Sequence, residues 1–141
     1  MDTLSPEDRS RLMALVKGKD TTPELLVRKL VFSLGYRYRL HAKELPGHPD
    51  LVFRSRGKVI FVHGCFWHRH SDPSCRLSRL PQTRMDYWVP KFQKNQLRDD
   101  RVLAQLEGLG WQVLVVWECE LRDPVAVKAK LKRFLDLPRS Q

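Results

Sequence analysis

The chain has 141 residues, of which 26 are lysine or arginine and 16 are aspartate or glutamate, so its formal net charge is +10. This length suits one domain with a real core and is too short for two. We expect no membrane span and no signal peptide, because no apolar run reaches about 18 residues and the N-terminus lacks the signal pattern. A surface this basic is typical of proteins that bind polyanions, nucleic acid first; a basic surface without such a partner is the plain alternative.

The cysteine count bears on the compartment and on metal binding. Three cysteines cannot all pair with one another, and nothing in the sequence indicates secretion. We therefore expect a reduced, cytoplasmic protein whose cysteines bind a metal.

The N-terminal segment predicts a short helix. Ser5 can cap it, Pro6 suits its first position, and it reaches about Val16. Its basic residues suggest an arm that contacts DNA, although a solvated basic face explains them equally well. We assign residues 1–20 to this arm and residues 21–141 to a single domain.

A second helix and a hairpin follow. Thr21-Thr22-Pro23-Glu24 predicts a helix start, the leucines at 26, 30 and 34 form its expected buried stripe, and Gly35 ends it. Residues 36–40 alternate as in a half-exposed strand. The apolar runs 50–53 and 58–62 flank Arg54-Ser-Arg-Gly57, which predicts a β-hairpin.

The C-terminal half predicts helix, strand and helix. Residues 87–109 form a long helix with Leu97, Leu103 and Leu106 toward the core, and residues 111–117 hold a buried strand. Asp123-Pro124 opens a last amphipathic helix. The element order predicts an α/β fold, with a mixed sheet covered by helices.

Potential ligands are concentrated where the 58–62 strand ends. After this apolar run the chain breaks at Gly64 into histidines, a cysteine and aromatics, at the edge of a sheet where α/β proteins place ligands. Three thiolates and one imidazole would form a closed, structural zinc site; these are Cys65, His70, Cys75 and Cys119. Three unrelated thiols are the alternative.

A second set of residues suits phosphodiester hydrolysis, which needs a hard cation near the phosphate and a base for water. Asp50 at a strand head is a natural magnesium ligand, and His63 and His68 can act as base or acid near neutral pH. Glu24 completes the set. Taken singly, Asp50 is more typical of a turn and Glu24 of a helix cap.

Aromatic residues lie beside this set. Phe66 and Trp67, joined by Trp88, can wedge between bases or stack on them. Packing over the zinc loop explains Phe66 and Trp67 equally well.

Several motifs together resemble the very-short-patch-repair (Vsr) family of mismatch endonucleases. The central one runs from Val59 through His63-Gly-Cys65-Phe-Trp-His68 to His70. The others are Lys19-Asp-Thr-x-Pro-Glu24, Gly47-x-Pro-Asp50 and Lys94-Asn95-x-x-Arg98-Asp99, which occur in the same order and extend the resemblance over nearly the whole chain.

The resemblance implies a restriction-endonuclease-like fold of the PD-(D/E)xK type, with histidine in place of the usual lysine motif. It also implies a magnesium-dependent nick on the 5′ side of the thymine in a T·G mismatch. Such mismatches arise when 5-methylcytosine deaminates, so a DNA cytosine-5 methyltransferase is the implied functional companion.

The resemblance also implies roles for individual residues. Asp50 and the Val62 carbonyl would bind magnesium, His63 and Glu24 would act on its waters, and His68 would be the general base or acid. Asn95 and Asp99 would support the site. The aromatic wedge would comprise Phe66, Trp67 and Trp88, with Met13 pressing from the opposite groove.

Two other functions remain open at this point. One is a zinc-stabilised DNA-binding module without hydrolytic activity, and the other is a nuclease of the same fold that cuts unmismatched DNA. We expect a monomer, because an asymmetric lesion gives no symmetry reason to dimerise.

Overall fold

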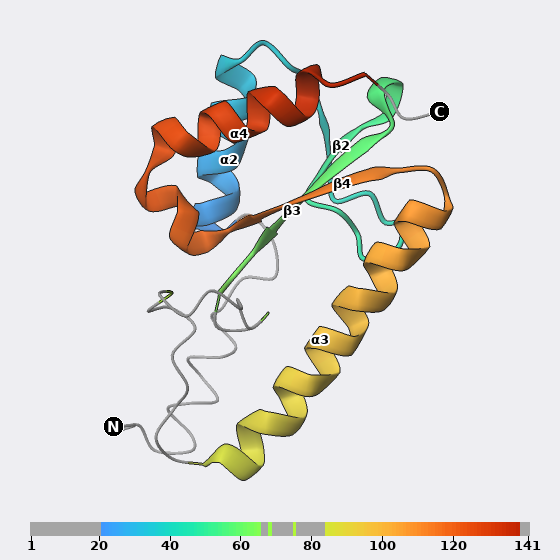
Figure 1. Cartoon of the computed structure of the whole chain (residues 1–141), viewed down its shortest axis with the longest axis vertical. Helices are drawn as coiled ribbons and strands as arrows, with labels where there is room; N and C mark the ends of the chain where they lie inside the picture. Colours follow the sequence, from blue (N-terminus) through green and yellow to red (C-terminus); the bar gives the residue numbers. More distant parts are fainter. Residues whose placement is uncertain (1–20, 66–67, 69–74, 76–83, 139–141) are drawn as a thin grey trace.

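The computed structural model describes residues 21–65, 68, 75 and 84–138 (Figure 1). This part contains a four-stranded sheet in the order β1-β2-β3-β4. Its strands are β1 (Arg39–Leu40), β2 (Leu51–Phe53), β3 (Lys58–His63) and β4 (Gln112–Trp117). The pairs β1–β2 and β2–β3 are antiparallel, whereas the pair β3–β4 is parallel. The predicted mixed sheet is confirmed, while the N-terminal arm lies outside the described residues.

The hairpin of β2 and β3 is confirmed, with Leu51 paired to Ile60 and Phe53 to Lys58. A 3₁₀ turn, η1 (Arg54–Arg56), leads to Gly57, whose φ of 65° lies in the left-handed region that glycine adopts without a steric penalty. The turn therefore reverses the chain within four residues and fixes the register of β3.

Helices cover both faces of the sheet (Figure 1). The helices α2 (Thr22–Ser33) and α4 (Pro124–Asp136) pack against each other on one face. The long α3 (Met85–Gly108) precedes β4 and packs its C-terminal end on the opposite face. Because alternate strand residues point to opposite faces, Ile60 and Val116 meet α2 and α4, whereas Val59 and Phe61 belong to the core beside Leu106 of α3.

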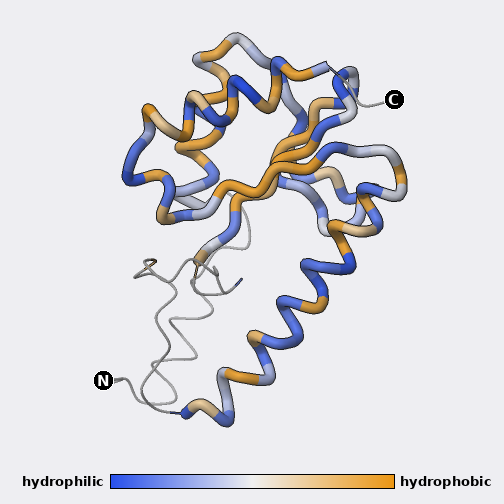
Figure 2. Tube along the Cα trace, in the orientation of Figure 1, coloured by the Kyte–Doolittle hydropathy of each residue, from blue (hydrophilic) through white to orange (hydrophobic). Residues whose placement is uncertain are grey.

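The hydropathy trace follows this layering: apolar residues concentrate along the strands, while α3 is largely polar (Figure 2). No helix among the described residues is long and apolar enough to cross a membrane.

The predicted helix starts are confirmed by their caps. Thr21 caps α2 by accepting the Glu24 N–H at 3.4 Å, and Asp123 caps α4 by accepting the Ala126 N–H at 3.2 Å. The left-handed Gly35 follows α2, as predicted.

The predicted apolar faces of two helices were partly wrong. In α2 the fully buried apolar residues are Val27 and Val31, while Leu26 is 41% exposed. In α3 Leu106 is buried as predicted, but Leu97 is 64% exposed. The reason is tertiary: only the C-terminal end of α3 lies over the sheet, and its N-terminal half extends beyond the sheet edge (Figure 1). Similarly, the expected strand at 36–40 shortens to the two residues of β1.

A buried lysine connects the hairpin to α4. Lys58, at the start of β3, is fully buried, and its ammonium donates to the carbonyl oxygens of Phe134, Leu135 and Leu137 at the C-terminal end of α4. These carbonyls belong to the last turn of the helix, where carbonyl oxygens lack helical partners. Lys58 therefore serves as a C-terminal cap supplied by another element.

Candidate active site

The first part of the site is the junction between Asp50 and β3. Asp50 immediately precedes β2, and its carboxylate oxygen Oδ2 accepts a hydrogen bond from the Val62 N–H at 2.6 Å. This hydrogen bond holds the Asp50 side chain beside the C-terminal end of β3, next to His63. The structure thus joins Asp50 to Val62 through the amide of Val62; the predicted role of the Val62 carbonyl stays a prediction.

Glycine 47 helps to bring Asp50 to this position. Gly47 has a φ of 74°, and a Cβ placed on it would lie 2.4 Å from Cγ1 of Val102 in α3. A side chain would therefore push the Gly47–Asp50 segment off α3. This is the physical reason for glycine in the Gly47-x-Pro-Asp50 motif.

Glu24 and Asp50 form a pair of neighbouring carboxylates, the first buried and the second 14% exposed. Glu24 is 4% exposed, and its ligand oxygen lies within 4.8 Å of that of Asp50 and of a ring nitrogen of His41. Burial raises the pKa of Asp50 to about 7; the Val62 hydrogen bond lowers the pKa, whereas repulsion from Glu24 raises it. Two carboxylates held this close suit a hard divalent cation, whose preferred ligands are oxygens.

Two residues that the sequence analysis missed complete this cluster. The Arg28 guanidinium nitrogen Nη2 lies 3.3 Å from Glu24 Oε2 and 3.1 Å from His41 Nε2. Arg28 is one helical turn beyond Glu24, a spacing that could have indicated the ion pair. His41 directly follows β1, and only the pairing of Leu40 with Leu51 reveals that it lies beside Asp50.

The second cluster comprises His63, His68 and Asp99. His68 Nδ1 lies 2.6 Å from Asp99 Oδ2, and the rings of His63 and His68 stack with centroids 3.9 Å apart. Asp99, predicted only to support the site, therefore contacts a candidate catalytic residue directly. Asn95 lies one turn earlier on α3, where its side-chain amide oxygen Oδ1 accepts from Arg98 Nη2 at 3.1 Å.

His63 is held in its neutral form. Burial lowers its pKa to about 4, the charge of neighbouring His68 acts in the same direction, and Asp99 opposes them. Within the described part of the chain, its Nδ1 is buried without a hydrogen-bond partner. A buried ring nitrogen without a protein partner can be satisfied by a water molecule.

These histidines open onto a cavity of about 820 Å³ between α3 and the sheet. Its polar side includes His63, His68 and Asp99, and its apolar wall includes Phe61, Val115 and Trp117. The four residues predicted to act together in hydrolysis are thus divided between two clusters: Glu24 and Asp50 lie with His41, and His63 and His68 lie with Asp99. They are adjacent because Val62, which binds Asp50, precedes His63 in β3.

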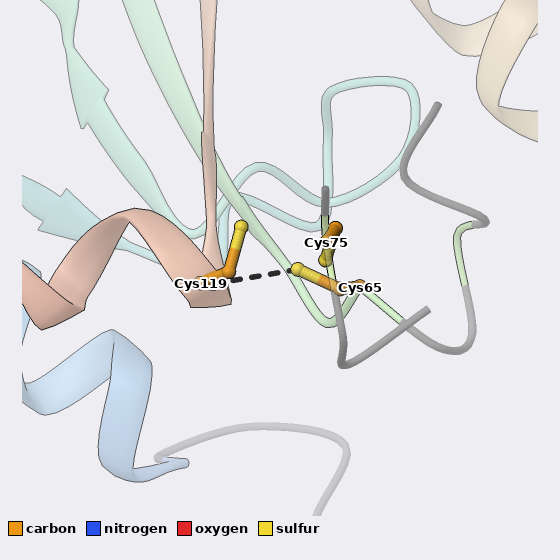
Figure 3. A group of neighbouring side chains, drawn as sticks. All are labelled: Cys65, Cys75 and Cys119. Atoms are coloured by element: carbon orange, nitrogen blue, oxygen red, sulfur yellow. Dashed lines mark hydrogen bonds between the residues drawn. The ribbon is translucent and has the colours of Figure 1, made fainter. Parts of the chain in front are cut away.

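The three cysteines lie together at the end of the parallel strands (Figure 3). Cys65 follows β3, and Cys119 lies in the 3₁₀ helix η3 (Glu118–Arg122) after β4. All three are buried, their sulfurs lie within 4.8 Å of one another, and the Cys119 N–H donates to Cys65 Sγ at 3.4 Å.

The chemistry of this sulfur cluster fits a zinc ion. Burial raises the pKa of Cys65 to about 12 and also raises that of Cys119, so both are neutral thiols in the metal-free protein. Three converging sulfurs are a typical zinc donor set. The fourth predicted ligand, His70, lies outside the described residues, so the complete site stays a prediction.

Most of the predicted aromatic wedge cannot be placed. Phe66, Trp67 and Met13 lie outside the described residues. Trp88, in the first turns of α3, is only 8% exposed and stacks on Phe92 with ring centroids 6.0 Å apart. A role of Trp88 at a mismatch would require this packing to change, and the wedge stays a prediction.

Comparison with known proteins identifies the family. Residues 1–74 match the sequence model described as DNA mismatch endonuclease Vsr. The chain belongs to the Vsr family. It is 43% identical over 114 residues to DNA mismatch endonuclease Vsr of Escherichia coli (strain K12), an alignment that covers 81% of this chain and 71% of that protein. It is also 55% identical over 135 residues to the type II nicking enzyme V.XorIIP of Xanthomonas oryzae pv. oryzae, covering 96% and 97% of the two chains.

Structural comparison agrees on the fold. The catalytic domain of the homing endonuclease I-Bth0305I superposes with a TM-score of 0.55 at 22% identity, over 82% of this chain and 94% of that domain. The nuclease-type fold is therefore confirmed. As a Vsr-family protein the chain is a DNA endonuclease, a hydrolase, which argues against a DNA-binding module without hydrolytic activity.

Proposed function

We propose that this Vsr-family endonuclease nicks one DNA strand on the 5′ side of the thymine in a T·G mismatch and so starts very short patch repair. The name of the E. coli relative includes mismatch endonuclease, and other relatives are named nicking enzymes. The mismatches would arise from deamination of 5-methylcytosine, so the companion enzyme would be a DNA cytosine-5 methyltransferase. The protein would act as a cytoplasmic monomer.

The observation that carries the proposal is the contact between His68 and Asp99. An aspartate 2.6 Å from Nδ1 favours the tautomer with the proton on that nitrogen. The Nε2 lone pair is then available to take a proton from an attacking water at the cavity. Asp99 fixes the ring orientation in the same way as the carboxylate partner of histidine in other hydrolytic sites.

A magnesium ion would be held by Asp50 and the Val62 carbonyl, and Glu24 and His63 would act on its water ligands. When bound, the ion would supply positive charge at the scissile phosphate and the leaving oxygen. The short separation of the Glu24 and Asp50 carboxylates, whose ligand oxygens lie within 4.8 Å of each other, supports this assignment.

Exposed basic residues support binding to the DNA backbone. Lys91, Lys94, Arg98 and Arg101 are exposed along α3, which also carries Asp99. Phosphate contacts of this kind position a protein without reading sequence. Lesion selectivity would come from Phe66, Trp67, Trp88 and Met13, because a T·G wobble pair is easier to pry apart than a matched pair.

The sulfur cluster would have a structural role. Cys65, Cys75 and Cys119, with His70 as fourth ligand, would hold zinc in a closed site without an open position for water. This site would fix the segment that carries His68 and the wedge residues.

Strand-specific nicking of labelled duplexes tests the proposal. The duplexes carry T·G or T·A at one position and are incubated with magnesium or with EDTA. We expect a magnesium-dependent nick 5′ of the thymine in the T·G duplex alone. Equal cutting of both duplexes would show a nuclease without mismatch selectivity, and cutting in EDTA would exclude the metal role.

A further inference from the structure

His41 connects the two carboxylates of the candidate cation site, yet none of the roles above uses it. Its Nε2 lies 3.8 Å from Glu24 Oε2, and its Nδ1 lies 3.9 Å from Asp50 Oδ1. Its side chain is 20% exposed, so it lies at the rim of the cluster. The imidazole therefore spans the gap between the two acids.

Arg28 determines which nitrogen of His41 carries the proton. The guanidinium is only a donor, and its Nη2 lies 3.1 Å from His41 Nε2. His41 Nε2 must therefore accept, and the neutral ring carries its proton on Nδ1. That N–H faces Asp50 Oδ1 at 3.9 Å, which is too long for a hydrogen bond, while Oδ2 accepts from Val62 at 2.6 Å.

The backbone also fixes His41 at this position. Its N–H donates to the Asp50 carbonyl at 3.3 Å, and its φ of 47° lies in the left-handed region, which is unfavourable for a residue other than glycine. Such a conformation persists where surrounding contacts hold it. The side chain is thus directed by both the β1–β2 pairing and Arg28.

We propose that His41, oriented by Arg28, is a positioning residue for a divalent cation at Asp50. Its Nδ1–H would orient Oδ1 from the outer side by electrostatic attraction, while Val62 holds Oδ2 by a hydrogen bond, and each oxygen would keep a lone pair for the cation. Imidazole and carboxylate partners of metal ligands act in this way at other sites. The inference rests on the proposed cation site and adds this residue pair to it.

The test measures Mn²⁺ binding to the full chain through loss of the free-ion EPR signal. The variants are His41→Leu, His41→Gln and Asp50→Asn, with Arg133→Leu on the exposed side of α4 as control. We expect His41→Leu to weaken Mn²⁺ binding about 10- to 100-fold, the usual effect of losing a partner of a metal ligand. His41→Gln should stay within about threefold, because an amide offers both an acceptor to Arg28 and a donor to Asp50.

Nicking kinetics provide a second readout. In His41→Leu the Mn²⁺ concentration for half-maximal nicking should rise by the same factor as the dissociation constant, while kcat at saturating Mn²⁺ should change little. Wild-type binding in His41→Leu, combined with lost binding in Asp50→Asn, would overturn the role of His41. Retained binding in Asp50→Asn would instead overturn the cation site itself.

The tautomer can be measured without any variant. Ring ¹⁵N chemical shifts of the wild-type protein should show His41 protonated on Nδ1. Protonation on Nε2 would refute the arrangement even if His41→Leu failed to fold.

Discussion

Replacement of Lys58 by methionine should destabilise the fold. Lys58 is fully buried and its ammonium donates to three carbonyl oxygens at the end of α4. Methionine keeps the apolar stem but has no donor. The Phe134 carbonyl cannot find a helical donor instead, because the residue four positions later is Pro138.

The size of the effect follows from the carbonyls left without a partner. The Leu135 carbonyl keeps a second donor, Arg56 Nη1 at 3.1 Å, so two carbonyls lose the donor that Lys58 provides. Both of these hydrogen bonds are only part-buried, and Leu137 is 51% exposed, so water can replace part of what is lost. At about 0.5–1.5 kcal/mol for each hydrogen bond, the loss is about 1–3 kcal/mol. This is a measurable share of the roughly 5–15 kcal/mol that stabilises a typical domain.

Urea unfolding followed by circular dichroism measures this change, with an unchanged m-value as the condition for comparing midpoints. The matched control is Lys132→Met, because Lys132 is 64% exposed and pairs with Asp136 within α4. The control should lose only about 0.3–0.5 kcal/mol, as an exposed pair one turn apart does. A Lys58→Met protein as stable as the control would refute the capping role.

Three further predictions concern the site. Asp99→Asn should lower kcat for nicking roughly 10²- to 10⁴-fold while DNA affinity in gel shifts stays near wild type, because His68 loses the carboxylate that orients it. Asp50→Asn should abolish detectable nicking and leave DNA binding largely intact, since it removes the proposed cation ligand. Cys75→Ser, or removal of zinc by a chelator, should lower Tm by about 10 °C, which is the shift that a loss of roughly 3 kcal/mol produces in a chain of this length. Purified wild-type protein should contain one zinc ion per chain.

One conservative variant serves as control for both carboxylates. Asp136→Asn changes an exposed acid in α4 and should leave nicking unaffected. Full nicking by Asp50→Asn would contradict the cation site, and an unchanged kcat in Asp99→Asn would show that His68 needs no carboxylate. A protein without zinc and with an unchanged Tm in Cys75→Ser would exclude structural zinc.

The strands and helix starts could be predicted because their signals are local. The apolar run after Lys58, the turn at Gly57 and the caps Thr21 and Asp123 depend on neighbours within a few residues, and the structure confirms each of them. Which face of each helix is buried was harder to predict. Whether Leu97 is buried depends on how far α3 extends past the sheet, and no pattern within the helix encodes that distance.

For the candidate active site, too, some features followed from the sequence and others from the tertiary structure. The sequence alone determined which residue types were available: the acids Glu24 and Asp50, the histidines that follow β3, and the cysteines beside them. Only the tertiary structure separated the acids from His63 and His68, paired Asp99 with His68, and brought Arg28 and His41 to the acids. The reason is physical: strand register and helix packing join residues that are distant in the chain, and these non-local contacts leave no periodic signal in the sequence.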